Sequence, residues 1–342
     1  MAEPRPRICR RCILPDTFPG ITFDDLGECS VCRSAGAPID LTRERDQSQA
    51  GMREVIERAR GTGRDYDCIV AYSGGKDSSY TLKLMVEEFR LRCLAVTIDN
   101  GFLSDQARLN GLAVTAALGV DLVTFRPAPA FMNRLYRESA TRDDLHAPAA
   151  IKRASATCSS CIQLVNTQMI RIALERGAPL IAGGYIGGQV PKGAAHLTLD
   201  VSLLARARTV GQARYVEAFG PEADTYLALP STARGAATVI VLNPMLVAQV
   251  TEEQIVASLS PLGWRRTADT GPQSTNCRLN DLGILVHFRK HGFNPYLFEM
   301  AEQVRQGLLD REVALARAHV IPTQEAVATQ AQQIGLDLDR LR

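Results

Sequence analysis

The sequence has no long hydrophobic run. No stretch of about 18 apolar residues occurs, which excludes a conventional membrane-spanning helix. Residues 1–11 are polar and rich in arginine, so they lack the apolar segment of a secretory signal peptide. We therefore expect a cytoplasmic protein without a membrane partner.

The chain also lacks an excess of one charge and is poor in aromatic residues. Its 39 Lys and Arg residues face 37 Asp and Glu residues, and aromatic residues make up only 6% of the chain. Strong nucleic-acid binding needs basic surfaces, often with stacking aromatic groups. Both figures therefore disfavour tRNA as a partner, although a local basic patch can still bind it. Only five basic residues are lysines, and two of them, Lys76 and Lys192, lie in glycine-containing loops.

Apolar runs typical of buried strands alternate with helical patterns in the middle of the chain. Strands are expected at 66–72, 91–98, 121–125, 180–185 and 238–243. The helices between them are expected at 79–90, 104–118, 130–139 and 162–176. This alternation predicts an α/β fold with a doubly wound parallel sheet, in which ligands bind at the carboxyl ends of the strands.

A glycine-containing loop follows the first expected strand and has the sequence Ser73-Gly74-Gly75-Lys76-Asp77-Ser78. Adjacent glycines let backbone N–H groups approach an anion, and the N-terminus of the next helix favours negative charge. Ser73 and Ser78 add hydroxyl donors, and Lys76 supplies a positive charge for a phosphate. Because a carboxylate is unusual in such a loop, we interpret Asp77 as a Mg²⁺ ligand or a helix cap.

The loop resembles the SGGxDS signature of the PP-loop ATP pyrophosphatases, which include enzymes of tRNA thiolation, amide formation and sulfur transfer. The resemblance implies that ATP binds at 73–78, that a substrate oxygen is adenylated and that pyrophosphate leaves. It also implies that adenine stacks around Ala71, Thr97 and Asp99. Glycines that follow a later strand, from Gly183, are candidates for the pocket wall, with Lys192 as a second phosphate contact.

Four of the nine cysteines form two Cys-x2-Cys pairs separated by 16 residues: Cys9, Cys12, Cys29 and Cys32. This spacing is typical of a zinc ribbon. Four thiolates complete a tetrahedral shell and leave no open position, so we predict a structural Zn²⁺ site. A segment of this length buries too little apolar surface to fold without the metal. Cys68 and Cys93 lie within apolar strands and are expected in the core.

The stretch around the quartet, with Pro15, Gly20, Phe23 and Asp24, resembles the N-terminal module of the N-acetyl sugar amidotransferases. That family shares the PP-loop core, so the resemblance covers residues 1 to about 125. We expect a zinc-ribbon module at 1–33, a connector at 34–64, a PP-loop domain at 65–250 and a helical region at 251–342. PP-loop relatives are often homodimers, although the sequence has no interface signature.

A second cysteine set consists of Cys158 and Cys161, at the start of an expected helix, and Cys277 far along the chain. A helix N-terminus lowers the pKa of thiols and favours thiolates. The arrangement resembles the PP-loop thiolases that hold a [4Fe-4S] cluster with a Cys-x2-Cys pair and one distant cysteine. The resemblance implies that these three residues are ligands and that one iron stays open for sulfide.

Three other interpretations of this set remain. The pair can work as a persulfide carrier or catalytic disulfide without iron. The thiols can be buried structural groups. They can also form a second zinc site with His287 or His291, which are otherwise expected on an exposed helix face.

The combined pattern favours an ATP-dependent sulfurtransferase that uses ATP and Mg²⁺, a sulfur donor, and a small or carrier-bound acceptor. An amidotransferase that takes ammonia from a partner glutaminase and acts on a sugar or other small substrate is the alternative. A third hypothesis is a zinc-ribbon scaffold or RNA-binding adaptor with a regulatory nucleotide site. The intact glycine-containing loop at 73–78 argues against that hypothesis.

Overall fold

A six-stranded sheet forms the centre of the molecule in the computed structural model, which describes residues 6–36, 38–191, 193–200, 203, 213–229 and 238–341. The strand order is β3-β2-β1-β4-β6-β5. Five strands run parallel, and β5 pairs antiparallel with β6 at one edge. The strands are β1 (Cys68–Ala71), β2 (Cys93–Ile98), β3 (Asp121–Phe125), β4 (Leu180–Ala182), β5 (His196–Leu199) and β6 (Val239–Leu242). The predicted α/β class and mostly parallel sheet are confirmed, whereas the antiparallel β5 was not predicted.

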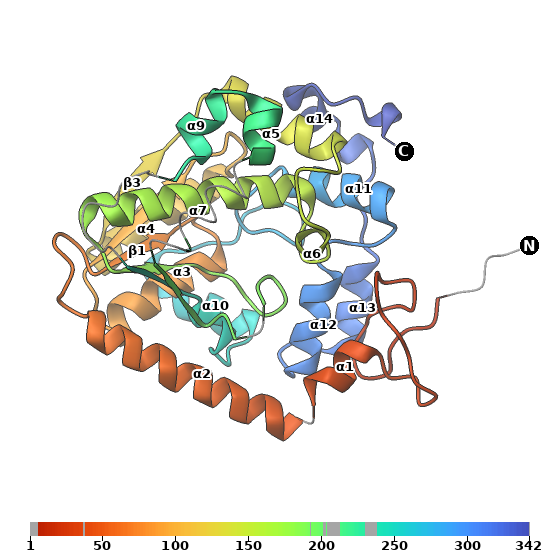
Figure 1. Ribbon diagram of the computed structural model, residues 1–342, viewed down its shortest axis with the longest axis horizontal. Helices are drawn as coiled ribbons and strands as arrows, with labels where there is room; N and C mark the ends of the chain where they lie inside the picture. Colours follow the sequence, from red (N-terminus) through yellow and green to blue (C-terminus); the bar gives the residue numbers. More distant parts are fainter. Residues whose placement is uncertain are drawn as a thin grey trace, which may run out of the picture.

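Helices cover both faces of this sheet (Figure 1). Residues alternate along β1, so Cys68 and Val70 belong to one buried cluster and Ile69 to another. The first cluster includes side chains from α2 (Pro38–Ala59) and α10 (Glu252–Leu259), and α3 (Lys76–Lys83) lies on the same side. The second cluster is covered by α7 (Ala156–Arg176).

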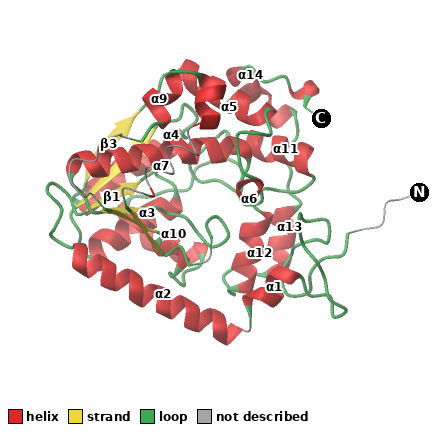
Figure 2. Cartoon of the chain, viewed as in Figure 1, coloured by secondary structure: helices red, strands yellow, loops and turns green. Residues whose placement is uncertain are grey.

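The other helical elements surround these layers, and Figure 2 shows the strands gathered at one end of a largely helical molecule. They are α1 (Ser30–Ala35), the π-helical η1 (Leu84–Glu88), α4 (Asp105–Leu118), α5 (Pro129–Thr141), α6 (Pro148–Ile151), α9 (Glu222–Leu227), η2 (Pro244–Leu246), η3 (Ser260–Leu262), α11 (Asn280–His291), α12 (Leu297–Arg305), α13 (Arg311–Ala318), η4 (Glu325–Val327), α14 (Ala328–Ile334) and η5 (Leu338–Arg340). Within the described part of the chain, no helix has the length and apolar character needed to cross a membrane.

The N-terminal cysteine module packs against the far end of the sequence. Its apolar side chains, among them Leu14 and Phe18, share one buried cluster with Leu297 and Ala301 of α12 and Ala314 of α13. Figure 1 shows this segment beside the same two helices. The segment after the module is more helical than the sequence suggested, because α2 spans 22 residues.

Candidate functional site

The glycine-containing loop joins the carboxyl end of β1 to the N-terminus of α3. Gly74 has φ +71°, and a Cβ at this position would lie 2.0 Å from the carbonyl oxygen of Ala107, so only glycine fits here. The hydroxyl of Ser78 accepts a hydrogen bond from the Ser73 N–H at 3.1 Å and lies 3.1 Å from the Ser73 hydroxyl. Gly75 caps α3 without a side-chain bond, and the Lys76 N–H donates to the Thr275 hydroxyl, so the following N–H groups of the first turn are the ones left for a ligand.

Lys76 and Asp77 form an ion pair at the mouth of the loop. The Lys76 Nζ lies 2.7 Å from Oδ2 of Asp77. Burial opposes the charge on Lys76, but the neighbouring Asp77 carboxylate raises the pKa of Lys76 above its usual value. The alternative of Asp77 as a helix cap was wrong, because the N-cap is Gly75 and no side chain caps it. Asp77 is thus a carboxylate that pairs with Lys76 beside the predicted phosphate site.

Two distant segments hold the loop in place. The indole Nε1 of Trp264 donates to the Gly74 carbonyl at 2.9 Å. The Thr275 hydroxyl accepts a hydrogen bond from the Lys76 N–H at 3.1 Å. Neither contact was predicted, since no local signal in the sequence links 264 or 275 to the loop.

The residues expected around adenine separate into two groups. Ala71 and Gly183 line a cavity of about 400 Å³ beside the phosphate loop, together with Ile98 and Asn100, and we call it the loop cavity. Thr97 and Asp99 are buried and do not line this cavity. Asp99 instead pairs with Arg108 at 3.3 Å and with Arg126 at 3.7 Å. Lys192 lies outside the described residues.

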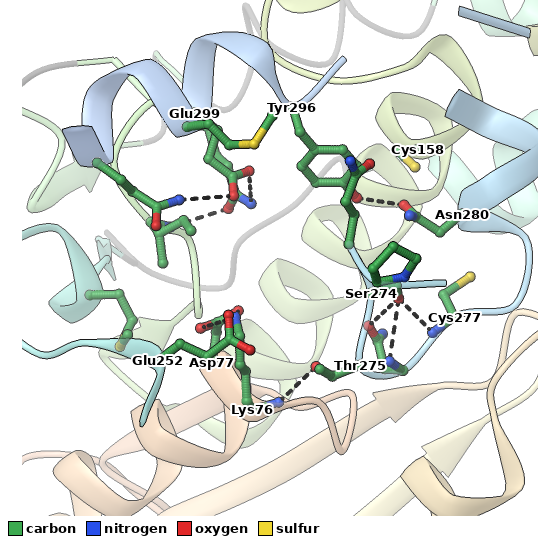
Figure 3. Close-up of a pocket in the computed structure, with 18 of the residues that line it drawn as sticks. Lys76, Asp77, Cys158, Glu252, Ser274, Thr275, Cys277, Asn280, Tyr296 and Glu299 are labelled. Atoms are coloured by element: carbon green, nitrogen blue, oxygen red, sulfur yellow. Dashed lines mark hydrogen bonds and ion pairs between the residues drawn. The ribbon is translucent and has the colours of Figure 1, made fainter. Parts of the chain in front are cut away.

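A second cavity of about 350 Å³ adjoins the first, and we call it the thiol cavity. Lys76 and Asp77 line it from one side, and the three cysteines Cys158, Cys161 and Cys277 line it from another. Figure 3 shows Lys76 and Asp77 facing Glu299 across the cavity, with Cys158 and Cys277 to one side. The loop and the second cysteine set, predicted separately, therefore share one cavity.

Asn100 connects two of these thiols. Its amide nitrogen donates to Sγ of Cys277 at 3.6 Å and to Sγ of Cys161 at 3.7 Å. Cys158 and Cys161 lie in the first turns of α7, which Ser155 caps by accepting from the Cys158 N–H at 3.2 Å. Residues separated by more than 100 positions thus converge on one site.

The ionisation of these thiols differs from expectation. Burial raises the pKa of Cys158 to about 11 and that of Cys277 to about 12. Burial also raises the pKa of Cys161. The desolvation cost therefore exceeds the stabilisation that the start of α7 offers to a thiolate. Without a bound cation such thiols stay protonated at neutral pH, which disfavours a metal-free persulfide carrier and fits either metal ligands or buried structural thiols.

The second zinc site with a histidine is not supported. Among the described residues, the N-terminal quartet is the only group of three or more Cys, His, Asp or Glu side chains whose ligand atoms all lie within 4.8 Å of one another. His287 is buried, contrary to the expectation of an exposed helix face, and it packs against Phe293 and His291. Burial lowers the pKa of His287 to about 3, which keeps the ring neutral in the core.

Glu299 is a site residue that sequence reasoning missed. It lies on α12, is 8% exposed and lines both cavities. Its carboxylate accepts from the amide of Gln189 at 2.8 Å and from that of Gln303 at 3.3 Å. Burial raises the pKa of Glu299 to about 7. The available signal was its place in a helical stripe with Tyr296, Met300 and Gln303, which all line the thiol cavity.

The N-terminal quartet forms a compact, fully buried ligand set. Sγ of Cys9 lies 3.8 Å from that of Cys32, and the same distance separates Cys12 from Cys29. Backbone N–H groups also point at the sulfurs, as in Cys29 N–H to Cys9 Sγ at 3.3 Å. Arg305 of α12 donates to Cys32 Sγ at 3.9 Å. The set therefore can hold one tetrahedral metal ion.

Comparison with known proteins gives two similarities. No protein-family model matches the chain. The chain is 28% identical over 287 residues to the uncharacterized protein MJ1599 of Methanocaldococcus jannaschii, and the match covers 84% of each. Among solved structures, it is similar to the U34-tRNA thiolase NcsA from Methanococcus maripaludis with its [4Fe-4S] cluster, at 13% identity over 95% of this chain and 92% of that chain. The TM-score of 0.33 for that pair is too low to support a conclusion about this chain.

Proposed function

We propose that the chain is an ATP-dependent sulfurtransferase of the PP-loop type, which adenylates a substrate oxygen and replaces it with sulfur. One observation carries the proposal. The short segment from Thr275 to Cys277 contacts the phosphate loop at one end and belongs to the three-thiol group at the other. A substrate activated beside Lys76 therefore needs to move little to meet a sulfur species at the thiols.

The first step transfers the adenylyl group. The acceptor oxygen forms a bond to the α-phosphorus of ATP, the bond from that phosphorus to the bridging oxygen breaks, and pyrophosphate leaves with the electron pair. The open N–H groups at the start of α3 and the Lys76 ammonium offset the charge that builds on pyrophosphate. Asp77 is the side chain placed to hold Mg²⁺ there.

The second step replaces the activated oxygen. A sulfur nucleophile forms a bond to the substrate carbon, and AMP leaves with the carbon–oxygen electron pair. Adenylation is needed because oxide and hydroxide are poor leaving groups. Buried side chains such as Tyr136 and Leu279 line the inner part of the thiol cavity and reduce the access of water to an adenylated substrate there.

The three thiols fit an iron–sulfur cluster. Their raised pKa values keep them protonated at neutral pH unless a cation is bound. All three line the thiol cavity, and Asn100 donates to two of them. Cys158, Cys161 and Cys277 would hold such a cluster, and it would supply sulfur-transfer chemistry beside the phosphate loop. Zn²⁺ in the N-terminal quartet completes the proposed cofactor set.

Metal analysis tests the cluster. Protein purified and reconstituted without oxygen is expected to contain four irons and labile sulfide, in addition to one zinc. The variant Cys158→Ala/Cys161→Ala/Cys277→Ala should lose the iron and keep the zinc. The matched control Cys68→Ala/Cys93→Ala removes two core thiols that lie outside the cavity and should keep both. Zinc without iron in the reconstituted wild type would contradict the cluster.

Two activity measurements test the reaction. Lys76→Ala should abolish release of pyrophosphate from ATP, and unchanged release would remove the adenylation step from the proposal. The donor is tested by supplying sulfide or ammonium to the wild-type enzyme. Product formed with ammonium alone would favour the amidotransferase, which the N-terminal resemblance also suggests.

A further inference from the structure

Two buried hydrogen-bond donors beside the three thiols have no partner. The Tyr136 hydroxyl and the Asn280 amide nitrogen make no hydrogen bond of normal length to any described residue, although the hydroxyl lies close enough to the Cys161 thiol to lower the pKa of that thiol against the raising effect of burial. The two side chains belong to residues that are 1% and 4% exposed, and both line the thiol cavity. A buried donor without a partner costs free energy, and such groups in native proteins usually point to an absent ligand or a functional role.

The packing brings Asn280 to the thiols. Gly283 lies one turn further along α11, and a Cβ there would lie 2.8 Å from the Ser155 hydroxyl and 3.7 Å from Cys158 Sγ. The missing side chain thus lets α11 approach the start of α7. The Tyr296 hydroxyl donates to the Asn280 amide oxygen, which leaves the N–H₂ group of Asn280 as the free end. Figure 3 places Asn280 and Cys158 on the same side of the cavity.

Tyr136 lies on α5, which contacts both α7 and α11. Its ring on α5 packs edge-on against Phe102 at 5.7 Å between centroids, which fixes the direction of the hydroxyl. Asn100, the donor to Cys161 and Cys277, also lines the thiol cavity. Since both N–H bonds of Asn100 are directed at these thiols, Tyr136 and Asn280 are the donors left for an anion that accepts hydrogen bonds.

We propose that Tyr136 and Asn280 form a donor cradle for the anionic sulfur, a sulfide or hydrosulfide, that is transferred at the three-thiol site, while Asn100 donates to the thiols themselves. The cradle rests on the proposed sulfurtransferase function and adds the residues that bind its nucleophile. Hydrogen bonds to a soft anion in a buried site both strengthen the binding of the anion and fix the direction from which it attacks.

Sulfide titration tests the cradle directly. Anaerobically reconstituted protein is titrated with sodium sulfide, and binding is followed by the change in the EPR spectrum of the reduced cluster. Tyr136→Phe removes only the hydroxyl, and Asn280→Asp keeps the acceptor oxygen that Tyr296 uses while it removes the donor. Each should weaken sulfide binding about tenfold or more, the size expected for one hydrogen bond to a charged group. Tyr215→Phe is the control, because the Tyr215 hydroxyl is partnered by Ser160, and it should leave sulfide affinity unchanged.

Stability of the iron-free protein gives an independent measurement. Removing an unpartnered buried hydroxyl should leave the unfolding midpoint of Tyr136→Phe equal to or above that of the wild type, whereas Tyr215→Phe should lower it. A lower midpoint for Tyr136→Phe would assign the hydroxyl a structural role and overturn the cradle. Unchanged sulfide affinity in iron-loaded Tyr136→Phe and Asn280→Asp would overturn it as well. Absence of iron from the wild type would instead refute the proposed function, and the cradle with it.

Discussion

The indole Nε1 of Trp264 donates a hydrogen bond to the carbonyl oxygen of Gly74 at 2.9 Å. Trp264 is the only tryptophan in the chain, and it is buried. Its fluorescence therefore reports on the conformation of the phosphate loop. A nucleotide that engages the N–H groups of the loop changes the environment of this hydrogen bond, so ATP binding should alter the emission.

The substitution Gly74→Ala should remove this ATP response. The new Cβ would lie 2.0 Å from the Ala107 carbonyl oxygen, which forces the loop out of position. Positive φ at a non-glycine residue costs about 1–2 kcal/mol, and the overpacking adds about 1–3 kcal/mol. ATP titration followed by tryptophan emission, with urea unfolding in parallel, measures both effects.

A matched control separates the effect of the steric clash with Ala107 from the free-energy cost of positive φ. Gly61 has the same φ of +71°, but a Cβ there meets no atom within 4 Å. Gly61→Ala should therefore be destabilised only by the cost of positive φ, and it should keep the ATP response. Equal losses of stability in the two variants would show that contact with Ala107 does not constrain the loop.

The sequence was informative where structure is set locally. The run before Ser73 forms β1 because Ile69 and Val70 are fully buried on opposite faces of the sheet. The predicted strand at 121–125 has the bounds of β3. The edge strand β5 was missed, because its sequence, His196–Leu199, is half polar and its antiparallel pairing depends on β6.

The site depended on contacts that the sequence does not encode locally. Cys277 and Cys161 both accept a hydrogen bond from Asn100, which lies on a different segment. Tyr136 and Asn280 read as ordinary helix residues, and their significance comes from the donors that folding leaves unpaired. Spacing identified the Cys-x2-Cys pairs, whereas only tertiary packing could bring the third thiol to the second pair.

Removal of the metal from the N-terminal quartet should loosen α12. The Arg305 side chain is fully buried between Glu302 and Cys32, and the module shares its apolar core with Leu297 and Ala301 of the same helix. Without the ion, the module loses the bonds that order it. We expect chelation to speed amide hydrogen exchange in α12 by about tenfold or more, as in local unfolding.

The control for this prediction is a core cysteine outside the quartet. Cys93→Ala should keep the metal and leave exchange in α12 unchanged, while Cys9→Ser should reproduce the effect of the chelator. Glu299 on α12 and Tyr296 at its start line the thiol cavity. Loosening of α12 would therefore transmit the loss of the metal at the quartet to the site. Slow amide hydrogen exchange in α12 after complete metal removal would show that the N-terminal module does not stabilise α12, which lines the thiol cavity.

Glu299 should make stability depend on pH near neutrality. Burial raises the pKa of Glu299 from its ordinary value of 4.5 to about 7, against the opposing effects of Gln189 and Lys76. Between these two values the folded protein keeps a proton that the unfolded chain has released. Stability therefore falls as pH rises through this window, by on the order of 3 kcal/mol for a shift of this size.

The substitution Glu299→Gln removes that titration and keeps the size of the side chain. Below about pH 4.5, where Glu299 is protonated in both states, the two proteins should have similar free energies of unfolding. Above about pH 7 the variant should be more stable by the full amount. Gln189→Leu should move the window to higher pH, because the hydrogen bond from Gln189 lowers the pKa of Glu299. Urea unfolding at intervals from pH 4 to 8 measures these curves. Parallel curves for wild type and Glu299→Gln would mean that the pKa of Glu299 is the same in the folded and unfolded states, so that Glu299 is not the proton-holding group of the cavity.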